Sequence, residues 1–164
     1  MTRALYVGPW RVDITVRPGV VSPVPSAGLA RAITAALEAA GATSPASIGL
    51  ILSDDDELAE LNAAHLGVDG PTDVLSFPLA PSPEFALPPG RRPQLGDIVV
   101  SVERAIEQAE AGRGGQTGDV RWSAADELRL LVTHGTLHVC GLDHAEPAEE
   151  AAMRTLERRL LATA

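Results

Sequence analysis

The chain has 164 residues, a formal net charge of −9 at pH 7, thirteen arginines and no lysine. No apolar run approaches the roughly 20 residues of a membrane-spanning helix, and the first residues lack the apolar segment of a secretory signal peptide. A single cysteine excludes an internal disulfide framework and is typical of the reducing cytosol. We therefore expect a cytoplasmic protein without a membrane partner, forming one domain over residues 1–164.

Strands and helices are expected to interleave along the chain. Alternating or continuous apolar patterns predict four strands, at residues 10–16, 48–52, 74–77 and 95–101. Five helices are expected, the first four beginning near Ser26, Ser53, Ser101 and Ser123 and the last at Pro147. The acidic run after Ser53 suits a helix N-terminus, although it could instead bind a cation. The interleaving predicts an α+β or α/β fold, with one small sheet and helices packed on it.

Three of the four histidines lie in the stretch 133–144, which reads T-H-G-T-L-H-V-C-G-L-D-H. His134 and His138 are four residues apart in an apolar helical run, so both imidazoles share one helix face. Gly141 is expected to end the helix in a left-handed conformation, and His144 follows three residues later. Three converging imidazoles suit a tetrahedral zinc ion with one open position, and their i, i+4, i+10 spacing is that of metzincin sites. The spacing therefore favours a catalytic metal site, whereas a single helical histidine is more often a core residue.

Two neighbours of the histidines refine this prediction. Gly135 stands where H-E-x-x-H peptidases carry the glutamate that activates water, so peptide hydrolysis by that route is disfavoured. Since glycine inside a helix is less favourable than alanine by about 1 kcal/mol, we expect it to permit close approach of a substrate or a neighbouring backbone. Cys140 points away from His138, and we interpret it as a small buried hydrophobe, with metal ligation as the alternative.

Three motifs resemble one known family. The segment H-G-T-L-H-V-C-G-L-D-H at 134–144 resembles the H-G-x-L-H-L-x-G-Y-D-H signature of the YbeY-type endoribonucleases, the bacterial rRNA maturation factors. Leu61-Asn62 followed by D-G-P-T-D-V-L-S-F-P at 69–78 resembles the family's L-N…D-x-P-T-[DN]-V-L-S-F-P, and L-G-D-I at 95–98 resembles its L-G-D-[IL] strand. The resemblance implies a four-stranded mixed sheet with about five helices, one of them a metzincin-like histidine helix.

The resemblance also implies a function. It indicates a metal-dependent endoribonuclease that acts on single-stranded RNA in rRNA 3′-end maturation and ribosome quality control, with the ribosome or ribosomal proteins as partners. We expect His134, His138 and His144 to hold one zinc ion, which lowers the pKa of bound water toward about 7 and polarises a phosphodiester oxygen. The resulting hydroxide, or a nearby ribose 2′-OH, would attack phosphorus. Three imidazoles also suit nickel or another divalent ion.

Metal-bound histidines normally donate their second ring N–H to a carboxylate or carbonyl. Asp143, beside His144, is our first candidate for this role, and the alternative is a turn residue that bonds its own backbone. Asp97, at the start of a predicted strand, is the second candidate. Polar residues of the P-T-D-V-L-S-F-P block could line the cleft or simply form a turn into the strand; they are Thr72, Asp73 and Ser76.

The chain departs from the family pattern after Asn62. Where the family has an arginine and a lysine that it is thought to need, this chain has Leu66 and Val68, and His65 replaces a usual aromatic residue and is expected to pack. Either another arginine such as Arg91 or Arg92 substitutes, or nuclease activity is weak or lost. The alternative function is therefore a zinc-containing ribosome-assembly or binding module with little catalysis. A metallohydrolase with another substrate is a third possibility.

The charge balance is unusual for a nuclease, because proteins that grip phosphate backbones commonly carry a basic footprint. Arginines cluster at 91–92, at 113 with 121, and at 154 with 158 and 159. We interpret each cluster as a solvated face, with an RNA-binding patch as the alternative.

Overall fold

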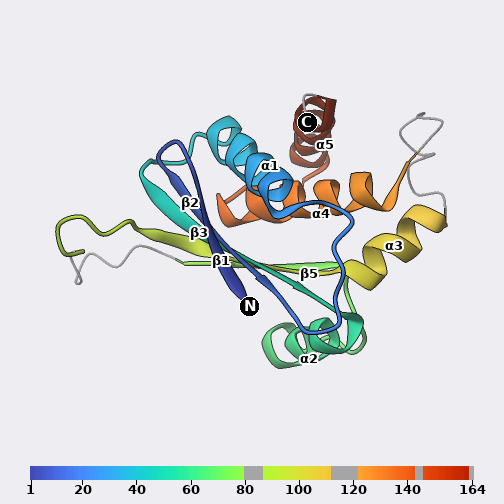
Figure 1. The fold of residues 1–164 in the computed structure, drawn as a ribbon. Helices are drawn as coiled ribbons and strands as arrows, with labels where there is room; N and C mark the ends of the chain where they lie inside the picture. The colour runs from blue at the N-terminus through green and yellow to red at the C-terminus, as the bar shows by residue number, and fades with distance from the viewer. Residues whose placement is uncertain (80–86, 112–121, 143–145, 163–164) are drawn as a thin grey trace.

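The computed structural model describes residues 1–79, 87–111, 122–142 and 146–162, and a mixed sheet with helices on both faces forms its centre (Figure 1). The strands are β1 (Thr2–Val7), β2 (Trp10–Val16), β3 (Ala46–Ser53), β4 (Val74–Pro78) and β5 (Gln94–Ser101). Their order is β1-β2-β3-β5-β4. The central strands β2, β3 and β5 are parallel, and β1 and β4 run antiparallel to their neighbours at the two edges. The mixed α+β architecture is as predicted.

The sheet has five strands rather than the expected four, and β1 is the additional one. It pairs along its whole length with β2, from Thr2 opposite Thr15 to Val7 opposite Trp10. Only Leu5 and Val7 pack against the core from this strand, whereas Tyr6 is 60 % exposed. An edge strand with so few inward residues carries a weak apolar alternation, which explains why the sequence pattern did not predict it.

The helices divide between the two faces of the sheet (Figure 1). Helices α1 (Ser26–Ala39) and α4 (Ala124–Val139) pack on one face, and α5 (Pro147–Ala162) packs on both of them. Helix α2 (Asp55–Leu66) lies on the opposite face, and α3 (Val102–Glu110) follows β5 and packs against α4. Within the described ranges, no helix is both long and apolar enough to cross a membrane.

The helix caps follow the sequence closely at three of four predicted positions. The side chain of Asp54 accepts a hydrogen bond from the Glu57 amide, so the acidic run caps α2 as expected. Ser101 caps α3, and Ser123 forms a reciprocal capping box with the third residue of α4. Ser26 is instead the first residue of α1, and Pro25 precedes it without a side-chain cap.

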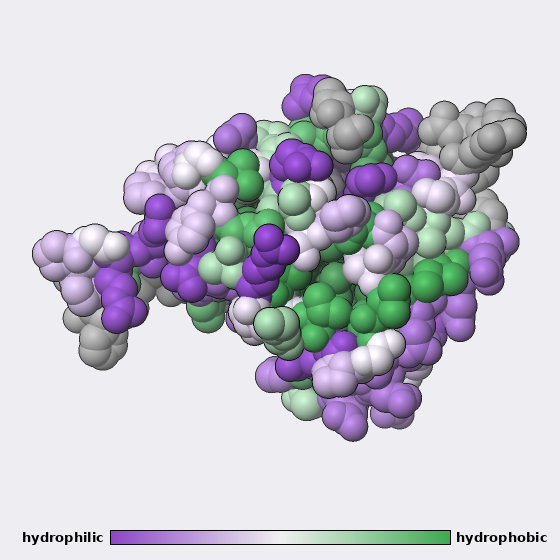
Figure 2. Space-filling view, viewed as in Figure 1, coloured by the Kyte–Doolittle hydropathy of each residue, from purple (hydrophilic) through white to green (hydrophobic). Residues whose placement is uncertain are grey.

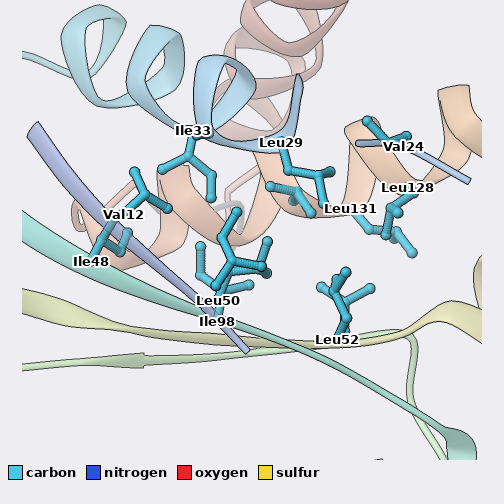
Figure 3. Packing of buried hydrophobic residues seen from close by; sticks show 14 of the residues in the cluster. Val12, Val24, Leu29, Ile33, Ile48, Leu50, Leu52, Ile98, Leu128 and Leu131 are labelled. Carbon is cyan, nitrogen blue, oxygen red and sulfur yellow. The ribbon is translucent and has the colours of Figure 1, made fainter. Parts of the chain in front are cut away.

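The main core lies between the sheet and the two helices α1 and α4 (Figure 3). Leu29 and Ile33 of α1 and Leu131 of α4 meet the strand residues there, and each is at most 1 % exposed. Burying such a side chain contributes about 1.5–3 kcal/mol. The core thus fixes α4, the histidine-bearing helix, against the sheet.

On the surface, apolar side chains gather below α4 and beside α3, with polar groups around them (Figure 2).

Gly135 sets how closely α4 approaches the sheet. A Cβ atom at this position would lie 2.7 Å from Ile98 Cγ2 and 3.2 Å from both Ser76 Oγ and Val74 Cγ2. The Ser76 hydroxyl donates a hydrogen bond to the Gly135 carbonyl at 2.9 Å. The glycine therefore permits close approach, as predicted, but the neighbours are side chains of β4 and β5 rather than a backbone.

We expect Gly135→Ala to lower the free energy of unfolding by about 1–3 kcal/mol, the usual cost of overpacking a filled interior. Alanine is the better helix former by about 1 kcal/mol, which offsets part of this loss. Urea unfolding of the variant beside the wild type measures the difference. A variant as stable as the wild type would show that α4 can withdraw from β4 without cost.

Candidate active site

His134 and His138 lie one turn apart on α4 and face each other. Their Nε2 atoms are 3.0 Å apart, and the ring centroids are separated by 4.6 Å at an interplanar angle of 71°. Both rings line a cavity of about 550 Å³. The cavity is also lined by Asp73 and residues of β4, by Leu66 at the end of α2, and by Gly141 and Leu142. The pair therefore stands in a cavity beside the edge strand of the sheet.

The end of α4 turns the chain back directly after the second histidine. Cys140 is the C-cap, and Gly141 follows with φ at +91°, in the left-handed region that favours glycine. The Gly141 amide donates to the His138 carbonyl and the Leu142 amide donates to the Leu137 carbonyl. This is the Schellman arrangement, so Gly141 ends the helix as predicted.

His144 and Asp143 lie outside the described residues, in the segment 143–145. The structure therefore brings together two of the three predicted metal ligands. Within the described ranges, no group of three or more histidine, cysteine, aspartate or glutamate residues forms a metal site.

The two described histidines fit a metal ion by their donor chemistry. Two nitrogens bound to one tetrahedral zinc ion, each at about 2.0–2.1 Å, lie roughly 3.3–3.4 Å apart. The observed separation of 3.0 Å is close to that value, and both Nε2 atoms are on the same side of the helix.

Glu157 of α5 contacts the histidine pair and was not predicted from the sequence. Its Oε1 atom accepts a hydrogen bond from Nδ1 of His134 at 2.6 Å, and its side chain is only 10 % exposed. It follows Met153 by four residues and precedes Leu160 by three, so it stands on the apolar stripe of α5. A carboxylate at a core position of an amphipathic helix was the signal that could have identified it.

Asp97 does not lie near the histidines. Its neighbour Ile98 points toward α4, and successive strand residues point to opposite faces, so Asp97 points away from that helix. It lies over Gly49 of β3, where any side chain would collide with its carboxylate. Burial first, and then the charge of Asp13, raise the pKa of Asp97. The structure does not support Asp97 as a partner of a metal-bound histidine.

Two other predicted roles are visible in the contacts. Cys140 lines a different cavity from the histidines, and burial raises the pKa of its thiol, as suits a small hydrophobe. His65 packs edge-on against Phe77, with ring centroids 5.1 Å apart. Both residues therefore have packing contacts, as predicted from the sequence.

The P-T-D-V-L-S-F-P block combines both roles that the sequence left open. The Asp73 carboxylate accepts from the Val74 amide at 2.8 Å, which is a local turn contact, and Asp73 also lines the histidine cavity. Ser76 lines the same cavity and is bonded to α4. Thr72 is not among the described lining residues.

The positions that depart from the family pattern are exposed. Leu66 and Val68 are 63 % and 51 % exposed, and Leu66 lines the histidine cavity. Arg92 does not substitute there, since it packs on Tyr6 and donates to the Pro9 carbonyl at the β1–β2 turn. That turn lies at the opposite edge of the sheet, because β1 and β4 are its two edge strands. Among the described residues, no arginine lines the cavity.

Comparison with known proteins gives concordant results. Residues 24–164 match the model of a family described as Endoribonuclease YbeY. The Endoribonuclease YbeY of Roseiflexus sp. strain RS-1 is 40 % identical over 152 residues, covering 92 % of this chain and 90 % of that protein. The one from Salinispora tropica is 44 % identical over 137 residues, covering 78 % and 80 %. The solution structure of TM1509 from Thermotoga maritima aligns with a TM-score of 0.52 at 26 % identity, covering 90 % of this chain and 86 % of that one.

We expect Asp97→Asn to raise the free energy of unfolding at pH 7. The pKa of this carboxyl group is higher in the folded than in the unfolded state, where it is about 3.9. The folded protein therefore loses free energy of unfolding as the pH rises from the unfolded pKa through the folded pKa. The charged form is therefore unfavourable at neutral pH, and asparagine removes that cost. Urea unfolding at pH 7 and near pH 3 measures the effect, which should shrink at the lower pH. A destabilised variant at pH 7 would mean that the carboxylate has a stabilising partner.

Proposed function

Because this chain belongs to the endoribonuclease YbeY family, we propose that it is a metal-dependent endoribonuclease that cleaves single-stranded RNA. We further propose that it acts in the cytoplasm in rRNA 3′-end maturation and ribosome quality control, with the ribosome or ribosomal proteins as partners. The observation that carries the catalytic part is the pair of Nε2 atoms, 3.0 Å apart, in a cavity beside an edge strand.

The metal would be held by His134, His138 and His144, and one zinc ion per chain suits three imidazoles, as would nickel or another divalent ion. When bound, such an ion supplies Lewis acidity to a phosphodiester oxygen and lowers the pKa of water toward about 7. The chain positions the donors on a helix that is closely packed against β4 and β5 through Gly135. Rigid placement of this kind is what a catalytic site requires.

The cavity itself determines how RNA would approach. It is lined by residues of β4, the edge strand, and Leu66 and Leu142 contribute apolar surface to its lining. Asp73 brings a carboxylate to the same cavity. Apolar surface suits a nucleotide base or ribose, so we propose that Leu66 and Leu142 contact the nucleoside, whereas the phosphate lies beside the two histidines.

The second candidate is a zinc-containing ribosome-assembly or binding module with little catalysis. The specific observation in its favour is the lack of an arginine among the described lining residues, with Leu66 exposed where a cation is expected. A cation at that point would stabilise charge in the transition state of phosphoryl transfer. Without it, binding can persist while the rate falls.

We expect the purified chain to contain about one equivalent of divalent metal and the His138→Ala variant to contain none. Losing a ligand should lower metal affinity by more than the roughly 10–100-fold that follows the loss of a residue hydrogen-bonded to a ligand. Elemental analysis of both proteins measures this. His65→Ala is the matched control, because His65 packs against Phe77 and neither residue is among the described lining of the histidine cavity. Metal retained equally in all three proteins would show that His138 is not a ligand.

The same proteins test catalysis on labelled single-stranded RNA. We expect cleavage that a chelator abolishes, that His65→Ala retains and that His138→Ala lacks; the last variant also controls for contaminating ribonuclease. Metal binding without cleavage, together with zinc-dependent sedimentation with ribosomal particles, would favour the binding module. Turnover of a small ester or amide with intact RNA would favour the third class.

Restoring a cation to the cavity should raise the rate. We expect Leu66→Arg to increase RNA cleavage by about tenfold, because a guanidinium at this exposed position can pair with phosphate. Leu87→Arg is the matched control, since Leu87 is 50 % exposed and lines a different cavity. Equal rates in the two variants would mean that position 66 does not reach the substrate phosphate.

A further inference from the structure

We propose that Glu157 is a positioning residue for the metal site. Its carboxylate holds the proton of His134 on Nδ1, so that Nε2 presents its lone pair on the side of His138. The inference rests on the proposed function, because it assigns Glu157 a role toward the metal that His134 would bind. It is independent of which substrate the enzyme cleaves.

The hydrogen bond between the two residues has the geometry of a strong contact. The distance from Nδ1 to Oε1 is 2.6 Å, at the short end for a nitrogen donor and a charged oxygen acceptor. A carboxylate oxygen can only accept, so the ring nitrogen that faces it carries the proton. A neutral imidazole has one such proton, and its other nitrogen, Nε2, is then available as a ligand.

The burial of Glu157 indicates that its carboxylate has a functional role. The residue is 7 % exposed, and the described contacts of its carboxylate are with His134 alone. Buried carboxylates are costly unless they are paired or hydrogen-bonded. Its neighbours Arg158 and Arg159 are exposed, so the carboxylate is directed inward although cations adjoin it in sequence.

The surrounding packing shows that the fold would accept an apolar residue at this position. Met153 is buried with Leu137 of α4, and Leu156 and Leu160 of α5 pack against them. Leucine at 157 would extend this stripe and remove a costly buried carboxylate, and His134, whose side chain is 29 % exposed, can carry its proton on the other ring nitrogen instead of leaving an unpaired Nδ1–H. A role in folding therefore gives no reason for a carboxylate here, whereas orienting His134 does.

The proposal separates two consequences of changing Glu157. Zinc affinity should fall about 10–100-fold in Glu157→Gln and Glu157→Leu, the usual effect of losing the carboxylate behind a metal-bound histidine. Glutamine keeps the volume but can donate to Nδ1 as well as accept from it, so it no longer selects one tautomer. The stability of the metal-free protein should be unchanged or higher in Glu157→Leu.

The experiment measures zinc affinity of the full chain by competition with a chromogenic chelator at fixed pH. Glu150→Gln is the matched control, since Glu150 lies on the same helix and pairs with Arg154 at the same distance of 2.6 Å, but in solvent. Its affinity should stay within about twofold of the wild type, as expected for a surface pair. Nitrogen-15 spectra of the metal-free protein should show His134 protonated on Nδ1 in the wild type and a shift toward Nε2 in Glu157→Leu.

The outcomes distinguish this inference from the proposed function. If the wild type binds zinc and both Glu157 variants bind it equally well, the positioning role is wrong and the metal site stands. If the wild type binds no zinc, the metal site is wrong and the positioning role falls with it. A loss of zinc affinity that only accompanies unfolding of metal-free Glu157→Leu would also overturn the proposal, because it assigns Glu157 to folding.

Discussion

The close packing of α4 on the sheet at Gly135 is the constraint on which the site depends. His134 and His138 flank this glycine, and the helix can approach β4 and β5 only because position 135 has no side chain. The bond from Ser76 to the Gly135 carbonyl joins the helix to the edge strand at the same point. The imidazoles consequently stand beside β4, and they line the same cavity as residues of that strand.

The same constraint explains the difference from the H-E-x-x-H peptidases. Their glutamate occupies the position directly after the first histidine, which is Gly135 in this chain. Here that position faces Ile98, Ser76 and Val74 at distances that leave no space even for a methyl group. A catalytic glutamate could not be accommodated without moving the helix. The chemistry proposed for this site therefore has no carboxylate base on α4 beside its first histidine, and the carboxylate that does contact His134 comes from α5.

The sequence predicted local features well and long-range ones poorly, for a physical reason. Helix caps such as Ser123 and the left-handed Gly141 depend on neighbours within a few residues, so the sequence contains the whole interaction. Asp97 was a candidate partner of a metal-bound histidine but points away from α4, because the direction of a strand residue depends on which face of the sheet that helix covers. Glu157 was missed because its partner is 23 residues away on another helix. Edge strand β1 was missed because its contribution to the core is small.

The distribution of arginines bears on how an acidic protein could bind RNA. Among the described residues, five arginines lie within 4 Å of a carboxylate of the chain itself; they are Arg11, Arg17, Arg104, Arg129 and Arg154. Such partly exposed pairs are worth about 1 kcal/mol or less, so they can open, but each carboxylate then competes with phosphate for the guanidinium. The described surface should therefore have a lower nonspecific affinity for a phosphate backbone. We therefore propose that selectivity for RNA comes mainly from the cavity beside β4 and from a partner that presents the strand to it.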